Sequence, residues 1–264
     1  MINKITLNNE TKEFYKLNFP IYYQLINLNE QLFVMSDIID QIGEVTLFKF
    51  FKPHRIIELG AATGNWCVIM NSLSDKSIEQ HFTLVEDFSW HNTEIKLDKQ
   101  FAINYNFPKN KIELENNIAN YIKSFNVIDK SVEQLIQEDL EQKVDLIRID
   151  CDIKDMMQWD KVLEWIDRNG SDNLIVLSDD IRSTSAPHRM LIMQQLVAQG
   201  KFRLMWIGED TAAWCRINII EKVYGWFDYI LNSNEHKLMS IDKRNVMLYG
   251  FKQEYLHTKR TRYE

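Results

Sequence analysis

A short apolar run followed by two glycines, RIIELGAATG (55–64), is the first stretch of the chain whose residue types could do chemistry. Glu58 lies two residues before Gly60, and Gly64 comes four residues after Gly60. Glycines let the backbone turn tightly and let a ligand approach main-chain atoms that a Cβ would block. In open α/β sheets, ligands bind at the carboxyl ends of the strands. The spacing therefore predicts a strand, a ligand-binding turn and a helix in that order.

A second acidic position follows the next apolar run, FTLVE (82–86). An acid at the end of a second strand can accept hydrogen bonds from both hydroxyls of a ribose. Glu86 and Asp87 compete for this role. We favour Glu86 because it directly follows the apolar pair Leu84 and Val85.

Aspartates gather after two further apolar runs, VDLIRIDCD (144–152) and NLIVLSDD (173–180). Adjacent parallel strands lie about 4.8 Å apart, so acids at their carboxyl ends can converge on one point. Several carboxylates in one cleft repel each other unless a cation lies between them. Hard oxygen ligands of this kind suit Mg²⁺, Ca²⁺ or Mn²⁺. The pattern predicts a divalent-cation site, with helix caps or solvated loop acids as the alternative.

Short apolar runs alternate with longer polar-punctuated segments from residue 55 onward, and runs that are apolar on both faces imply parallel strands covered by helices. The predicted strands are 55–59, 82–86, 111–115, 144–150, 173–179, 202–208 and 212–219. Helix signals lie between them: a capping box at Ser131 and Gln134, and a helix that begins near Ser185 and Pro187 and ends at Gly200. We predict an α/β fold of the Rossmann-like, doubly wound type, with a mostly parallel seven-stranded sheet.

The domain organisation follows from the same pattern. Residues 1–52 carry apolar residues at helical spacing, which predicts two or three helices that form an N-terminal helical cap. Residues 53–220 form the predicted ligand-binding domain. The segment 221–264 is expected to pack on the same domain, and its pattern is ambiguous between helix and strand.

Composition narrows the class of protein. The chain has 264 residues, 45% of them hydrophobic, and a formal net charge of −7, which disfavours nucleic-acid and anionic-membrane binding. No apolar run approaches the roughly 20 residues that a bilayer span needs. Cys67, Cys151 and Cys215 show no disulfide or metal spacing, so we expect reduced thiols and a cytoplasmic protein.

The stretch ELGAATG resembles the first motif of class I S-adenosylmethionine-dependent methyltransferases, E/D-x-G-x-x-x-G after strand one. The spacing lacks the central glycine of the dinucleotide fingerprint GxGxxG, which argues against NAD or FAD. The resemblance implies S-adenosyl-L-methionine as cofactor and a ribose contact at Glu86. It also implies an adenine contact after strand three, in LENNIANYI, where Asn117 is the candidate. The remaining cofactor-binding residues implied are Glu58, Gly60, Ala61, Gly64, Trp66 and Asp150.

Within that family the chain looks most similar to cation-dependent O-methyltransferases that act on small molecules and sugars. The resemblance assigns the metal, Mg²⁺ or another divalent cation, to Asp150, Asp179 and Asp180. It also gives Asp150 a catalytic role. Two residues depart from the pattern, because Cys151 replaces a glycine and Ile153 stands at the position of a frequent histidine base.

The departure at Ile153 leaves the general base open. Lys154 is the predicted base, since catechol-type relatives use a lysine near this position; His188 and Asp152 are the alternatives. The expected activity is metal-assisted methyl transfer to a hydroxyl of a small molecule or sugar, without a nucleic-acid or membrane partner. A homodimer is the candidate assembly. A non-catalytic S-adenosylmethionine-binding scaffold and a nucleotide-dependent oxidoreductase are the competing hypotheses.

Overall fold

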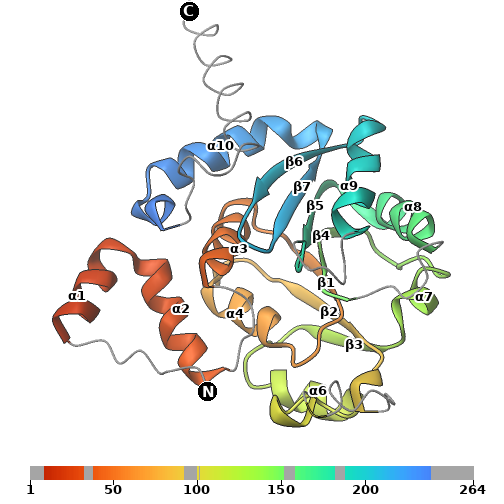
Figure 1. The fold of residues 1–264 in the computed structure, drawn as a ribbon, viewed down its shortest axis with the longest axis horizontal. Helices are drawn as coiled ribbons and strands as arrows, with labels where there is room; N and C mark the ends of the chain where they lie inside the picture. The colour runs from red at the N-terminus through yellow and green to blue at the C-terminus, as the bar shows by residue number, and fades with distance from the viewer. Residues whose placement is uncertain are drawn as a thin grey trace, which may run out of the picture.

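The computed structural model describes residues 9–32, 38–91, 100, 102–151, 158–181 and 188–238 (Figure 1). A seven-stranded sheet in the order β3-β2-β1-β4-β5-β7-β6 forms its centre. The strands are β1 (Arg55–Leu59), β2 (His81–Glu86), β3 (Phe125–Asp129), β4 (Val144–Ile149), β5 (Gly170–Ser178), β6 (Phe202–Ile207) and β7 (Ala212–Arg216). The pairs from β3 to β5 are parallel, and β7 runs antiparallel to both β5 and β6. The predicted doubly wound, mostly parallel sheet is confirmed.

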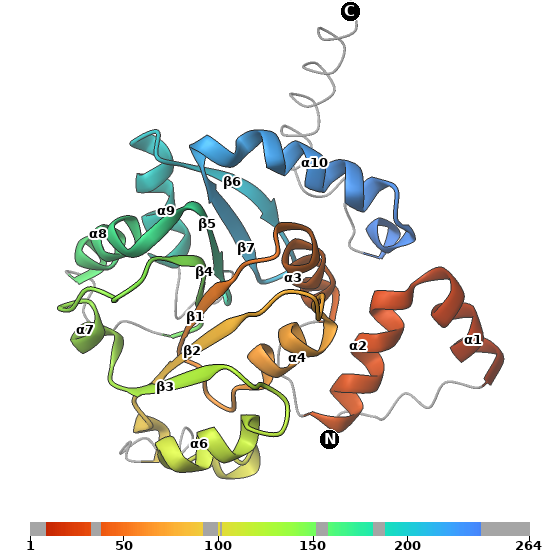
Figure 2. The same cartoon turned by 180° about the vertical axis from the view of Figure 1, so that it is seen from behind.

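Helices cover both faces of this sheet (Figures 1 and 2). One face packs against α3 (Ile38–Phe51), α4 (Asn65–Leu73), α6 (Lys111–Ile118) and α10 (Ile220–Leu231). The other face packs against α7 (Val132–Leu135), α8 (Trp159–Asn169) and α9 (His188–Ala198). Neighbouring residues Ile56 and Ile57 of β1 enter opposite layers, as the two-residue period of a strand requires. Short 3₁₀ helices are η1 (Ser89–His91), η3 (Ile217–Ile219) and η4 (Asn234–Lys237).

The N-terminal helices divide into two groups. Helix α2 (Pro20–Gln31) lies beside α3 and α4, and α1 (Asn9–Asn18) packs on the side of α2 that faces away from them (Figure 2). Helix α3 is instead part of the core, since Ile42 and Leu47 are fully buried against the sheet layer. The predicted helical cap thus contains three helices within its described residues. The third of them, α3, contributes Asp40 and Glu44 to the site described below.

The predicted third strand, residues 111–115, is wrong. This segment is helix α6, and Asn110 caps it by accepting a hydrogen bond from the backbone N–H of Glu113 at 3.0 Å. Leu114 and Ile118 are both buried, four residues apart, which is the helical period rather than the strand period. The third strand is Phe125–Asp129, whose short run NVID was not assigned from the sequence.

Other predictions made from local sequence signals are confirmed. Ser131 and Gln134 form the predicted capping box, although the helix that they begin is only four residues long. Gly200, with φ +73°, follows the end of α9 as predicted. The described part of the segment after residue 220, which ends at residue 238, contains helix α10, whose buried residues recur at helical spacing: Val223, Trp226, Phe227 and Ile230.

Glu235 joins the C-terminal part of the described chain to the N-terminal helices. Its Oε1 accepts the backbone N–H of Ile21 at 2.7 Å in the first turn of α2, and its side chain is buried. A buried backbone N–H that loses its hydrogen-bond acceptor costs about 1–3 kcal/mol. Burial raises the pKa of Glu235, so its contribution is that of an acceptor and not that of a charge. We expect Glu235→Ala to lower the free energy of unfolding by about 1–3 kcal/mol in urea titrations. Glu164→Ala, an exposed change on α8, is the control, and equal effects of the two changes would contradict this assignment.

None of the helices in the described part of the chain has the length and apolar character required to cross a membrane. The three cysteines form no disulfide, in agreement with the expectation of unpaired thiols.

Candidate functional site

The glycine turn connects β1 to α4 at the carboxyl edge of the sheet. The backbone N–H groups of Gly60 and Ala61 both donate to the carbonyl oxygen of Val85, at 2.9 and 3.1 Å, which ties the turn to β2. Gly60 and Gly64 adopt φ +84° and +75°, and Ala62 adopts φ +46°. The predicted order of strand, turn and helix is therefore present, with the turn beside the position where the chain order reverses between β1 and β4.

The two glycines are also required by packing. A Cβ on Gly60 would lie 2.4 Å from the carbonyl oxygen of Asp150, and a Cβ on Gly64 would lie 2.6 Å from the Ile118 side chain. The turn thus fits closely between the end of β4 and helix α6.

We expect Gly60→Ala to destabilise the protein by more than 2 kcal/mol, because positive φ and a backbone collision act together. Gly200→Ala is the matched control, since Gly200 has nearly the same φ of +73° but no atom within 4 Å of the added methyl group. It should show the conformational cost alone, about 1 kcal/mol. Urea unfolding of both variants measures the difference, and equal losses would show that the close approach to Asp150 is unimportant.

Glu86 at the end of β2 closes the turn from one side. Its Oε2 accepts the backbone N–H of Ala62 at 2.7 Å, and its Oε1 accepts that of Phe88 at 3.3 Å. The residue is 5% exposed, and burial raises the pKa of its carboxyl group to about 7 despite these N–H donors. Asp87 is exposed. The structure thus brings Glu86, rather than Asp87, to the glycine turn.

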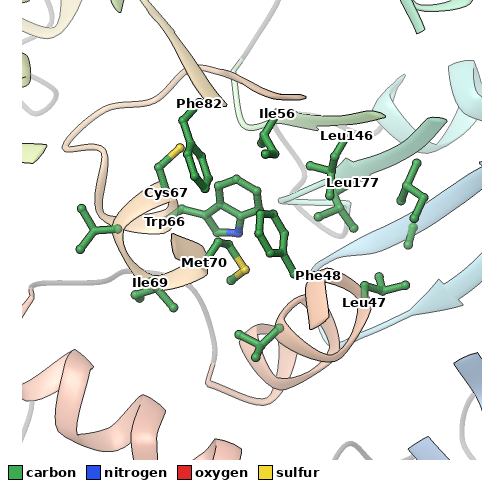
Figure 3. Packing of buried hydrophobic residues seen from close by; sticks show 14 of the residues in the cluster. Leu47, Phe48, Ile56, Trp66, Cys67, Ile69, Met70, Phe82, Leu146 and Leu177 are labelled. Atoms are coloured by element: carbon green, nitrogen blue, oxygen red, sulfur yellow. The ribbon is translucent and has the colours of Figure 1, made fainter. Parts of the chain in front are cut away.

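Trp66 and Glu58, two of the predicted cofactor residues, point into the core below the turn. Figure 3 shows Trp66 among Phe48, Met70 and Phe82. Its indole N–H donates to Oε2 of Glu44 on α3 at 2.9 Å. Glu58 is 1% exposed and accepts the Cys67 thiol. The structure therefore places both side chains away from the surface on which a ligand of the turn would lie.

A buried arginine contacts the acidic side chains at this edge of the sheet. Arg148 lies near the carboxyl end of β4, opposite Glu58 of β1 in the parallel register, and its side chain is 2% exposed. Its Nη1 donates to Glu58 at 2.8 Å and to Asp150 at 2.6 Å, and its Nη2 donates to Asp179 at 2.5 Å. Glu44 lies 3.8 Å from its Nε. We call Arg148 and these four carboxylates the arginine cluster.

The arginine cluster has one cation for four carboxylates. Burial raises the pKa of Glu44 to about 8, that of Glu58 to about 7 and that of Asp150 to about 6, although Arg148 opposes each shift. Burial alone would lower the pKa of the Arg148 guanidinium, but the four carboxylates of the cluster hold it well above its usual value. The Trp66 ring adds a cation–π contact, 5.2 Å from the guanidinium carbon to the ring centre. These pKa values imply that part of the cluster is protonated near neutral pH, which reduces the excess of negative charge around the guanidinium.

The β6–β7 turn is fixed to the same cluster by helix α3. Asp40 accepts the backbone N–H groups of Glu209, Asp210 and Thr211 at 2.7, 2.7 and 3.1 Å. The Thr211 hydroxyl then donates to Asp179 at 3.0 Å. Asp179 is thus held from two sides, by Arg148 and by Thr211.

The predicted metal site does not fit this arrangement. The sequence argument required a cation between the carboxylates, and Arg148 is that cation for Asp150 and Asp179. Asp180 is exposed, with φ +55°. Within the described ranges, no group of three or more His, Cys, Asp or Glu side chains could hold a metal ion. We therefore derive no catalytic step from Mg²⁺.

Several other predicted residues are placed differently or are not described. Asn117 was expected after strand three, but it lies on helix α6, where its side chain is exposed. The true third strand ends at Asp129, which is the register partner of Glu86. Asp152, Ile153 and Lys154 lie outside the described residues, and so does the side chain of His188.

Arg148 belongs to this candidate site and was not predicted from the sequence. It stands in VDLIRID, a strand buried on both faces, where an arginine needs partners. The two-residue period places Arg148 and Asp150 on the same side of the strand, and that signal was available in the sequence.

Comparisons with known proteins give a likeness of fold. The described chain is similar to a putative caffeoyl-CoA O-methyltransferase from Staphylococcus aureus, with 18% identity over 82% of this chain and 100% of that one and a TM-score of 0.48. A putative O-methyltransferase from Klebsiella pneumoniae matches with 14% identity over 79% and 96% of the two chains and a TM-score of 0.47. An SAH-bound methyltransferase from Podospora anserina matches with 14% identity over 80% and 97% and a TM-score of 0.49. No protein-family model and no curated protein matches the sequence.

Proposed function

We propose that the chain is an S-adenosylmethionine-dependent methyltransferase that acts on a hydroxyl group of a small molecule or sugar. The observation that carries the proposal is the 2.7 Å hydrogen bond from Ala62 to Glu86. It joins the glycine turn and the strand-end acid, which are 24 residues apart in sequence, at the carboxyl edge of the sheet. These are two of the features by which the sequence resembles the family.

The residues at this edge fit the adenosine part of the cofactor. Glu86 has carboxylate lone pairs beyond those that Ala62 and Phe88 use, and they can accept the two ribose hydroxyls. Gly60 and Ala61 present backbone without a bulky side chain beside it. The adenine would lie toward the end of β3, near Asp129, because β3 is the next strand outward from β2.

The acceptor would lie over the ends of β4 and β5. S-adenosylmethionine, when bound, supplies a methyl group on a positively charged sulfur. Asp150 is the described acid best placed to take the hydroxyl proton, since its main chain lies against Gly60 and its side chain is 30% exposed. The pKa of Asp150, raised to about 6 by burial, suits a base near neutral pH. Arg148 holds this carboxylate in position.

The sheet disfavours the oxidoreductase alternative. The dinucleotide-binding fold has strand order 3-2-1-4-5-6 and a GxGxxG turn. In this protein the antiparallel strand β7 lies between β5 and β6, and Ala62 occupies the place of the central glycine. Both features favour a ligand other than NAD.

Binding of the adenosine part should depend on pH through Glu86. Ribose hydroxyls donate to the ionised carboxylate, whereas the free protein keeps Glu86 protonated below its pKa of about 7. Affinity should therefore rise from pH 5 to pH 7, by at most about tenfold per pH unit, and level off above it. Adenosine is the probe, because it has no group that titrates in this range. The slope should vanish in Glu86→Gln, and a flat profile for the unmodified protein would contradict this assignment.

Transfer itself separates the proposal from a non-catalytic scaffold. The protein is incubated with methyl-labelled S-adenosylmethionine and a panel of phenols and sugars, and label in the product is counted. We expect transfer to at least one hydroxyl compound and its loss in Asp150→Asn. Tight cofactor binding without transfer to any member of a broad panel would favour the scaffold.

A further inference from the structure

We propose that Arg148 takes the place of a divalent cation in this site, so that the protein works without a metal. The inference rests on the proposed function only for its catalytic part. The claim that the site binds no divalent cation stands on the arginine cluster alone and can be tested alone.

The first step is geometric. Asp150 and Asp179 follow neighbouring strands, and the two nitrogens of one guanidinium bridge them at 2.6 and 2.5 Å. The planar fork of a guanidinium suits this bridging of two carboxylates, and its charge is permanent. An ion that bound the same oxygens would have to displace a side chain that is 2% exposed.

The second step concerns what holds Arg148 there. It extends from the carboxyl-terminal part of β4, with Glu58 of β1 beside it at 2.8 Å and the Trp66 ring against it. Glu44 of α3 lies 3.8 Å from its Nε. Contacts from three elements, β1, α3 and α4, therefore hold the guanidinium at the carboxylates.

The third step concerns the acceptor. A bound Mg²⁺ commonly takes substrate oxygens into its shell, which selects molecules with two adjacent oxygens. Arg148 is enclosed by carboxylates and offers no such open positions. The acceptor then needs a single hydroxyl within reach of Asp150, so simple alcohols and monohydroxyl phenols are acceptable as well as vicinal diols.

The direct test is titration of the metal-stripped full-length protein with Mn²⁺, followed by electron paramagnetic resonance of the free ion. We expect no site-specific uptake at equimolar Mn²⁺, with Asp179→Asn indistinguishable from the unmodified protein. Uptake of one ion per chain that disappears in Asp179→Asn, but persists in the matched surface variant Asp172→Asn, would overturn the proposal.

A second measurement uses the cofactor. Affinity for S-adenosylmethionine should agree within twofold in excess EDTA and in excess Mg²⁺, and a tenfold loss in EDTA would overturn the proposal. Absence of cofactor binding under both conditions would instead refute the proposed function, while the Mn²⁺ titration would still decide whether Arg148 replaces the ion. The two failures are therefore distinguishable.

Discussion

Replacement of Arg148 by methionine should lower the free energy of unfolding by about 3–5 kcal/mol at pH 8, the largest effect expected of any single change in this protein. Methionine fills much of the same space but leaves Glu44, Glu58, Asp150 and Asp179 without their shared cation. Removal of one partner from a buried ion pair costs this much because the remaining charge has lost its compensation.

The loss should be smaller at pH 5. Without Arg148, the pKa values of the buried carboxyl groups rise further above their unfolded values, and the folded state then binds more protons than the unfolded state. Stability therefore falls as pH increases from about 4.5, the ordinary glutamate value, toward 8. Urea unfolding of the variant and of the unmodified protein at pH 5, 6.5 and 8 measures this slope as the difference between their free energies of unfolding.

Arg216→Met is the matched control for Arg148→Met. Arg216 is a partly buried arginine that donates to Asp167 at 2.7 Å, outside the arginine cluster. Burial opposes ionisation of Asp167, but hydrogen bonds from Lys201 and Arg216 lower its pKa. Lys201 remains in Arg216→Met, so we expect this carboxyl to stay ionised from pH 5 to 8. The loss in free energy of unfolding caused by Arg216→Met should therefore be the same from pH 5 to pH 8. If both variants showed the same pH slope, the arginine cluster would not be the charged unit described here.

Replacement of Glu86 by alanine should weaken S-adenosylmethionine binding roughly 100-fold or more. Hydrogen bonds to a charged group contribute about 1.5–3 kcal/mol each, so two ribose hydroxyls together account for at least two factors of ten. The measurement is isothermal titration calorimetry at pH 8, where the carboxyl group is ionised.

Asp87→Ala is the control for Glu86→Ala, since Asp87 is the adjacent, exposed acid. It should change affinity less than twofold. Equal losses in both variants would point to a general effect of negative charge, and a larger loss in Asp87→Ala would transfer the ribose contact to that residue. Circular dichroism of each variant checks that the fold is retained.

The sequence predicted the sheet well because each signal was local. Runs apolar on both faces marked six of the seven strands, and the glycines at 60 and 64 marked the turn. The third strand was missed because KIELE alternates like a strand while its burial follows Leu114 and Ile118 at helical spacing. The local sequence is compatible with either a strand or a helix, and the packing of Leu114 and Ile118 in the folded protein favours the helix.

The site was predicted less completely because its chemistry depends on partners far apart in the chain. Glu86 was correctly brought to the turn, since strand ends in a parallel sheet share one edge. The acids at 150 and 179 were correctly brought together, but their partner was taken to be an ion rather than Arg148. Glu44 of α3 could not be assigned to this cluster, because nothing in the sequence fixes how that helix packs on the sheet.

The central claim is that the carboxyl edge beside Gly60 and Glu86 binds S-adenosylmethionine. Calorimetric titration of S-adenosylmethionine into the unmodified protein, with NAD as the rival ligand, tests it most directly. The account predicts micromolar binding of S-adenosylmethionine, about −8 kcal/mol, and no measurable binding of NAD. Tighter binding of NAD, or no binding of S-adenosylmethionine, would contradict it.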